Sequence, residues 1–323
     1  MSKQAICSIT TKSHWYKTLA LAESIHELSP TTTVCILTVD GSKKDLEKIE
    51  YHKGNIKVYE THEITLSQTA KNIAQKYQAK PDYLRWSLKS IFLLHLLEVE
   101  AYERLFCCDN DIFFYNNFDF LMEDLKHHAV LITPHYYRFN PERNQAWLEG
   151  NFLSGLYNAG FIGVNQNAKE ILEWWAKCCL YRCQKNSKKG LYVDQKFLDL
   201  FPIIEPSTKI VRQKGCNVAY WNLFQNERVL VNNEVLIKGI DPVIFIHYVP
   251  HTFQGICSGE DALLKPHLDK YCKVLKKYNP DFSLENAFSK IDYQGIWKYF
   301  KWRLEFLWYR LSYRKWYKQK FVD

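Results

Sequence analysis

The chain has 323 residues, of which 47% are hydrophobic and 24% are charged. This balance is ordinary for a globular protein and excludes intrinsic disorder, and 12 Gly and 10 Pro are too few for a collagen-like or linker-like chain. Of the net charge of +8, six positive charges come from residues 290–323, which hold nine basic and three acidic side chains. The remaining chain is nearly neutral, which disfavours a nucleic-acid-binding body.

The first half of the chain alternates apolar runs with segments that carry apolar residues at helical spacing. The expected strands span residues 4–10, 33–39, 56–59, 104–108, 129–133 and 161–164. The expected helices span residues 16–28, 81–97 and 168–185. This order predicts an α/β fold with a mostly parallel central sheet flanked by helices. We expect one domain over residues 1–280, followed by a basic, aromatic-rich tail over residues 281–323.

The cysteines and the apolar runs indicate the compartment. None of the ten Cys forms a C-x-x-C pair, so we expect reduced, mostly buried thiols and no zinc site. The N-terminus lacks the apolar segment of a signal peptide, and the longest apolar run, residues 91–97, is too short to cross a bilayer. We therefore expect a cytoplasmic protein.

The triplet Asp109-Asn110-Asp111 directly follows the apolar run at 104–108 and precedes another at 112–114. In an extended segment the two carboxylates project to the same side, whereas Asn110 points away. Unpaired charges between two core segments are costly, and paired carboxylates are suitable ligands for Mg²⁺ or Mn²⁺. The triplet therefore predicts a metal site, with a solvated acidic turn as the alternative.

Arg85 and Lys89 lie four residues apart on the expected helix 81–97, and therefore on one face of it. Opposite an acidic strand end, they would hold a diphosphate or steady the carboxylates. An ordinary solvated helix face is the alternative.

Six short motifs occur in a fixed order along residues 4–250. They are Tyr83-Leu84-Arg85, Arg104 to Asp111, Tyr157-Asn158-Ala159-Gly160-Phe161, Asp194-Gln195, Trp221-Asn222 and Ile246-His247-Tyr248. This series resembles that of glycosyltransferase family 8 and its relatives. The resemblance implies a GT-A fold and a retaining, metal-dependent transferase that uses a nucleotide-sugar donor.

The resemblance also implies roles for individual residues. The metal ligands would be Asp109, Asp111 and His247, and the ion would be Mn²⁺ or Mg²⁺. Gln195 would lie beneath the anomeric carbon, with Asp194 on the sugar hydroxyls, as the catalytic pair. The donor-binding residues would be Thr10, Thr11, Tyr16, Arg85, Lys89, Asn110, Asn158, Ala159, Gly160 and His251.

Two of these assignments have plain structural alternatives, and one family feature is absent. Residues 158–160 could instead form a simple turn before a strand. His247 could instead be a core histidine whose hydrogen bonds are satisfied within the protein. Family 8 members commonly carry a Gly and Lys-Pro-Trp shortly after the His, whereas here no Lys follows until Lys265. His251 or Lys89 would then have to bind the leaving diphosphate.

The tail carries twelve aromatic residues between Tyr293 and Phe321, interleaved with its basic residues. A helical projection gives an apolar arc beside a basic wedge, which is typical of a helix that lies on an anionic membrane surface. The alternatives are a helix docked on the domain and a binder of RNA.

Together these features predict a glycosyltransferase on the inner face of the cytoplasmic membrane. It would move a hexose from a nucleotide diphosphate donor, UDP-linked, to a membrane-borne glycan such as lipopolysaccharide or capsule, and no nucleic-acid partner is expected. The alternatives are a nucleotidyltransferase, although 9–13 lacks its Gly-rich loop, and an inactive membrane-attached sugar-binding or scaffolding protein.

Overall fold

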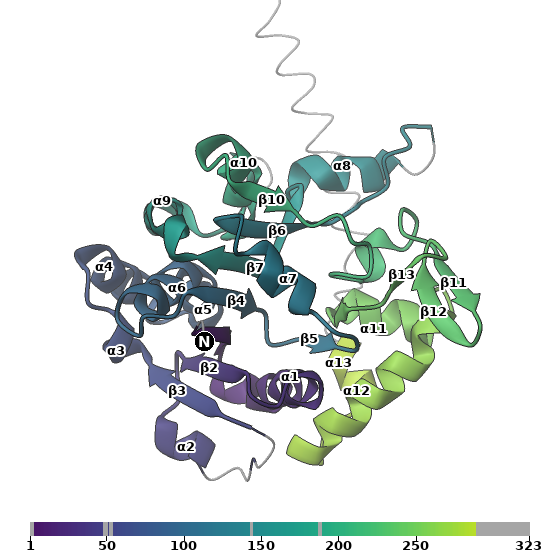
Figure 1. The fold of residues 1–323 in the computed structure, drawn as a ribbon, viewed down its shortest axis with the longest axis horizontal. Coiled ribbons are helices and arrows are strands. Elements are labelled where there is room, and N and C mark those ends of the chain that lie inside the picture. Colours follow the sequence, from purple (N-terminus) through teal and green to yellow (C-terminus); the bar gives the residue numbers. More distant parts are fainter. Residues whose placement is uncertain (1–2, 48–50, 52–53, 143–144, 187–188, 289–323) are drawn as a thin grey trace, which may run out of the picture. The chain divides into compact units, whose positions relative to one another are not determined.

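The computed structural model describes residues 3–47, 51, 54–142, 145–186 and 189–288 (Figure 1). The chain separates into two compact units, residues 1–282 and 283–323. The described helix of the second unit is α13 (Leu284–Phe288). The basic aromatic helix predicted within 290–323, and its membrane contact, lie outside the described residues. Among the residues that are described, no helix has the length and apolarity needed to cross a bilayer.

The first unit is built on a seven-stranded sheet with the strand order β10-β6-β7-β4-β1-β2-β3. These strands are β1 (Gln4–Thr10), β2 (Thr33–Thr38), β3 (Ile56–Glu60), β4 (Arg104–Cys108), β6 (Val130–Pro134), β7 (Tyr157–Asn165) and β10 (Thr208–Ile210). All neighbouring pairs are parallel except those of β7, which runs antiparallel to β4 and β6. The predicted α/β fold with a mostly parallel sheet is confirmed.

Helices cover both faces of this sheet (Figure 1). On β1, Ala5, Cys7 and Ile9 belong to one core cluster, which also contains residues of α4, α5, α6 and α9, and Ile6 belongs to a second, which contains residues of α1 and α7. Strands buried on both faces need continuous apolar runs, which explains the pattern QAICSIT. The helices are α1 (Trp15–Leu28), α2 (Lys43–Glu47), α3 (Thr61–Ile64), α4 (Gln68–Tyr77), α5 (Pro81–Ser87), α6 (Lys89–Glu98), α7 (Asp119–Asp124), α8 (Gln145–Leu153), α9 (Lys169–Arg182), α10 (Phe201–Ile204), α11 (Pro250–Cys257) and α12 (Lys265–Tyr278).

Two predicted elements differ from the structure. The single helix expected over 81–97 is two helices, α5 and α6, because Leu88 (φ −90°, ψ −1°) ends one and caps the next. The bend at Leu88 interrupts the helix face that Arg85 and Lys89 were expected to share. The strand expected over 161–164 begins at Tyr157, so residues 158–160 form part of β7 rather than a turn before it.

Three small sheets complete the unit. They are β5 (Ile112–Phe114) with β14 (Phe245–His247), β8 (Lys185–Asn186) with β9 (Leu191–Tyr192), and β11 (Arg228–Val231) with β12 (Glu234–Ile237) and β13 (Asp241–Pro242). In the antiparallel pair β5 and β14, His247 lies opposite Ile112. This pairing places His247 beside the end of the acidic triplet.

A buried ion pair fixes the loop that precedes β11. The Arg228 guanidinium lies 3.0 Å from the carboxylate of Asp261, and both side chains are almost fully buried. Arg228 also donates from Nη2 to the carbonyl of Ala219 (2.9 Å) and from Nη1 to that of Asn222 (3.2 Å). These bonds hold the short 3₁₀ turn Tyr220–Asn222, which carries Trp221.

We expect Arg228→Met to lower the free energy of unfolding by about 3–5 kcal/mol, because it leaves the Asp261 carboxylate buried without a countercharge. Urea unfolding followed by circular dichroism measures the change. The exposed Arg212 supplies a control, and Arg212→Met is expected to change stability by less than about 0.5 kcal/mol. Equal stability of the two variants would contradict this role of the pair.

Candidate active site

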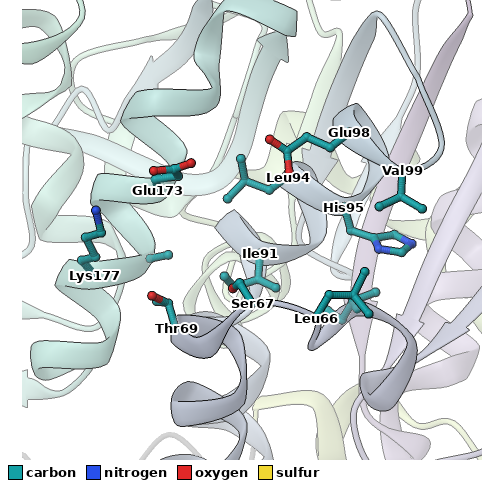
Figure 2. A pocket seen from close by; sticks show the side chains of 12 residues that line it. Leu66, Ser67, Thr69, Ile91, Leu94, His95, Glu98, Val99, Glu173 and Lys177 are labelled. Carbon is teal, nitrogen blue, oxygen red and sulfur yellow. The ribbon is translucent and has the colours of Figure 1, made fainter.

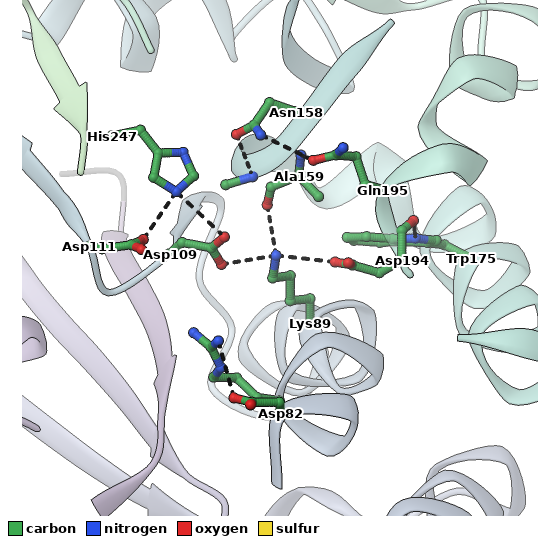
Figure 3. A network of polar contacts seen from close by, with 12 residues as sticks. Asp82, Lys89, Asp109, Asp111, Asn158, Ala159, Trp175, Asp194, Gln195 and His247 are labelled. Atoms are coloured by element: carbon green, nitrogen blue, oxygen red, sulfur yellow. Dashed lines mark hydrogen bonds and ion pairs between the residues drawn. The ribbon is translucent and has the colours of Figure 1, made fainter. Parts of the chain in front are cut away.

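The acidic triplet lies at the carboxyl end of β4, the middle strand of the seven-stranded sheet. Figure 3 shows its two aspartates beside His247 and Lys89. The backbone N–H of Asp109 donates to the carbonyl of Gly160 on the neighbouring strand β7 (2.7 Å). Asn110 turns away from the two aspartates, and its Nδ2 lies 3.4 Å from Oγ1 of Thr10. Ligands of such sheets bind beyond the carboxyl ends of the strands, so the triplet is correctly placed for a binding site.

Asp109, Asp111 and His247 come together at this point. Nε2 of His247 lies 3.0 Å from Oδ1 of Asp111 and 4.0 Å from Oδ2 of Asp109. One potential ligand atom from each residue lies within 4.8 Å of the other two. The three side chains form a group that could hold one metal ion, the same three residues that the family resemblance implies.

Two neighbours fix the ring of His247. The indole of Trp221 packs edge-on against it, with 5.2 Å between ring centres and 87° between planes. The second is Gly160, where an added Cβ would lie 2.4 Å from Cε1 and 2.7 Å from Nδ1 of His247, and 2.5 Å from Oδ1 of Asn158. Only glycine at position 160 leaves room for the imidazole in this position.

Lys89 supplies the countercharge for two carboxylates of the site. Its ammonium lies 2.9 Å from Asp109 and 3.1 Å from Asp194, and it donates to the carbonyl of Ala159 (2.9 Å) (Figure 3). Lys89 is 2% exposed. Burial disfavours its charge, but the two carboxylates outweigh burial and raise the pKa of Lys89 above its ordinary value. Lys89 therefore stays protonated and bonded to protein acceptors.

Further positive charge acts on Asp111. Burial alone would raise the pKa of Asp111, but the charge of His247, followed by the charges of Lys17 and Arg85, outweighs it and holds that pKa well below its usual range. The Arg85 guanidinium lies 3.4 Å from Asp82, and its Nε is buried with no hydrogen-bond partner among the described residues. Lys17 and Arg85 therefore add positive charge that acts on the metal-ligating group.

A second polar network lies along β7. Oε1 of Gln195 accepts from Nδ2 of Asn158 (3.0 Å) and from the N–H of Ala159 (3.2 Å), and its Nε2 donates to the carbonyl of Ser154 (2.9 Å). Oδ1 of Asn158 accepts from the N–H of Gly160 (2.9 Å). The amide of Gln195 is therefore engaged at both ends and holds the strand that borders the metal-ligating group.

His135 extends this network through hydrogen bonds of both its ring nitrogens. Nδ1 of His135 lies 2.9 Å from the carbonyl of Gly155, and Nε2 lies 3.2 Å from Nδ2 of Asn158. Burial lowers the pKa of His135 to about 3, so the ring is neutral, donates from Nδ1 and accepts at Nε2. A neutral ring suits a positioning role.

The remaining predicted donor-binding residues lie on three elements. Thr10 ends β1, and Thr11 bonds to Nδ1 of His14 (2.7 Å) in the turn that follows. Tyr16 lies on α1, and burial, with a contribution from the charge of Asp111, raises its pKa. His251 is exposed at the start of α11, where its ring stacks on Tyr220 (6.3 Å, 25°).

Several residues of the site were missed by sequence reasoning. They are Lys17, His135 and Trp175, and no role was assigned to Trp221 despite its place in a motif. The Nε1 of Trp175 donates to the carbonyl of Asp194 (2.9 Å) and so fixes the residue that pairs with Lys89. Isolated aromatic and histidine residues carry no sequence signal for such roles, because the contacts join distant segments.

Comparison with known proteins supports the fold. No protein-family model matches the chain. It is similar to two uncharacterized proteins of Bacillus subtilis (strain 168), YfnF and YfnD. YfnF is 25% identical over 76% of this chain and 80% of its own length, and YfnD is 24% identical over 77% and 78%.

Among solved structures, the chain is similar to the galactosyltransferase LgtC. An active-site mutant of LgtC matches with a TM-score of 0.54 at 12% identity, over 88% of this chain and 99% of the other. LgtC in complex with donor and acceptor sugar analogs matches with a TM-score of 0.50 at 13% identity, over the same shares. The first unit of the chain therefore has the GT-A fold of glycosyltransferases, and membership of family 8 stays a prediction.

Proposed function

We propose that the protein is a metal-dependent, retaining glycosyltransferase that moves a hexose from a nucleotide diphosphate donor, UDP-hexose, to a membrane-borne glycan such as lipopolysaccharide or capsule. The observation that carries this proposal is the group Asp109, Asp111 and His247 at the carboxyl end of β4 in a GT-A fold. The acceptor and its place on the inner face of the membrane rest on the basic tail of the sequence.

The three side chains fit a divalent ion. Oδ1 of Asp111 is buried and has no hydrogen-bond donor of suitable geometry among the described residues, although Nε2 of His247 is 3.0 Å away. Two ligands at right angles on an ion, with bonds of about 2.1 Å, lie about 3.0 Å apart. Carboxylates suit Mg²⁺ and Mn²⁺, and the imidazole favours Mn²⁺ of the two.

The protein's own residues would divide the work around the reacting centre. Asp109, Asp111 and His247 would hold the ion, which when bound stabilises negative charge on the leaving diphosphate. Lys89 keeps the carboxylates from repelling one another and is not available to bind phosphate. Arg85, whose charge already reaches Asp111, is the better candidate for the cation that binds the diphosphate.

The network along β7 bears on whether the transfer retains the configuration of the anomeric carbon of the donor sugar. Gln195 is a neutral amide engaged by Asn158, Ala159 and Ser154, and Asp194 is bonded to Lys89, so neither is an apt nucleophile. This arrangement favours transfer on one face of the sugar, in which the leaving phosphate oxygen takes the acceptor's proton. Asn158 and the backbone of residues 159–160 would position the donor sugar for this step.

Asp111→Asn is expected to reduce Mn²⁺-dependent hydrolysis of UDP-hexose by at least about 100-fold, because it removes one charged ligand of the ion. Release of UDP is the measurement, with a panel of UDP-sugars as donors. The exposed Asp281 supplies the control, and Asp281→Asn should keep full turnover. Undiminished turnover in Asp111→Asn refutes the metal assignment, and no turnover by the unaltered protein with any donor favours the inactive scaffold.

Gly160→Ala is expected to weaken Mn²⁺ binding about tenfold or more, because the new methyl group would displace the ring of His247. Isothermal titration calorimetry measures the affinity. Gly163→Ala is a matched control on the same strand, since the nearest atoms to a methyl group there belong to the side chain of Leu131, at 3.1 Å or more. If both variants bind Mn²⁺ like the unaltered protein, His247 is not a ligand.

Removal of residues 290–323 is expected to abolish binding to phosphatidylglycerol vesicles, because these residues carry six of the eight net positive charges. Cosedimentation with vesicles measures binding, and neutral phosphatidylcholine vesicles are the control. Equal binding with and without the segment would eliminate the membrane anchor while leaving the catalytic proposal in place.

A further inference from the structure

Two cavities of similar size lie outside the metal-ligating group but differ in charge. The first, of about 270 Å³, lies between α4, α6 and α9 and has both acidic and basic residues in its wall, including Glu98, Glu173 and Lys177 (Figure 2). The second, of about 260 Å³, is lined by Lys76, Lys80 and Arg182 and has no acidic residue among its lining. Only the second has the uniform positive charge that selects an anion.

Two of its three cations are available to a ligand. Lys76 donates to the carbonyls of Leu180 and Tyr181 and so caps the end of α9. Within the part of the chain that the structure describes, neither Lys80 nor Arg182 lies within ion-pair distance of an acidic side chain.

A row of aromatic rings extends from this basic cavity along α5. Tyr77 and Tyr83 line the cavity and stack on each other (6.2 Å, 19°), and Tyr83 packs edge-on against Trp86 (5.5 Å, 65°). The Arg85 guanidinium lies 5.8 Å from the ring centre of Trp86. The row therefore extends from the cavity along α5 to Trp86.

The hairpin of β8 and β9 adds another cation along this row. The ammonium of Lys185 lies 5.4 Å from the ring centres of both Trp86 and Tyr192. Val193 and Asp194 follow directly after β9, so the hairpin joins the row to the residue that pairs with Lys89. Cations beside these half-buried rings make a surface that attracts anions and also accepts the apolar face of a sugar.

We propose that the basic cavity binds an acidic group of the acceptor glycan, a phosphate or a carboxylate, while the sugar chain lies along Tyr83 and Trp86 toward the metal-ligating group. This inference rests on the proposed function, because only a glycosyltransferase has an acceptor glycan. The fork of Arg182 bonds two anionic oxygens at once, and Lys80 adds a flexible point charge. The same chemistry would fit the headgroup of an anionic lipid, which the experiment must distinguish.

The first test compares the binding of digalacturonic acid and neutral galactobiose to the full chain at low salt, without donor or metal. The unaltered protein is expected to prefer the acid about tenfold, and the preference should shrink at high salt because exposed charges are screened. The double variant Lys80→Gln/Arg182→Gln should lose the preference. Lys71→Gln/Lys273→Gln, which removes two exposed charges elsewhere, should retain it.

A second arm separates the lipid from the glycan. Phosphatidylglycerol vesicles should bind the unaltered protein and the Lys80→Gln/Arg182→Gln variant equally. The proposal is overturned if that variant keeps its preference for the acidic disaccharide, or if it loses vesicle binding instead. Because the assay contains no donor, a failure here is distinguishable from a failure of Mn²⁺-dependent hydrolysis.

Discussion

The site depends on balancing negative charge at a buried sheet end. Asp109 and Asp194 approach the ammonium of Lys89 from two sides, and Asp111 faces His247. Buried carboxylates without countercharges would protonate or force the strands apart. Lys89 satisfies two of them, which leaves Asp111, the second oxygen of Asp109 and the imidazole directed at a common point. A divalent cation at this point would complete the charge balance and give the site its chemistry.

The fold supplies this balance from segments far apart in the chain. β4 ends at the triplet, the bend at Leu88 turns Lys89 under it, and the pairing of β5 with β14 brings His247 across from Ile112. The glycine at position 160 and the indole of Trp221 then set the angle of the imidazole. Each of these contacts joins only a few side chains or one strand pair. The GT-A topology brings them together at the end of one strand.

The sequence predicted the parts of this architecture that local rules govern. The apolar run at 104–108, followed by two aspartates, was sufficient to predict a buried strand and the carboxylates at its end. The bend at Leu88 was not predictable, because neither Leu88 nor its neighbours Ser87 and Lys89 is a glycine or proline that would signal the end of a helix. The engagement of Gln195 and the support from His135 arise from tertiary contacts, which periodicity does not encode.

The most direct measurement is a crystal structure of the protein grown with Mn²⁺ and UDP, with anomalous scattering recorded at the manganese edge. We predict one anomalous peak within bonding distance of Asp109, Asp111 and His247, with the diphosphate of UDP on its open side and Lys89 still bonded to Asp109 and Asp194. UDP bound with no peak among these three side chains, or a peak held by other residues, would contradict this prediction.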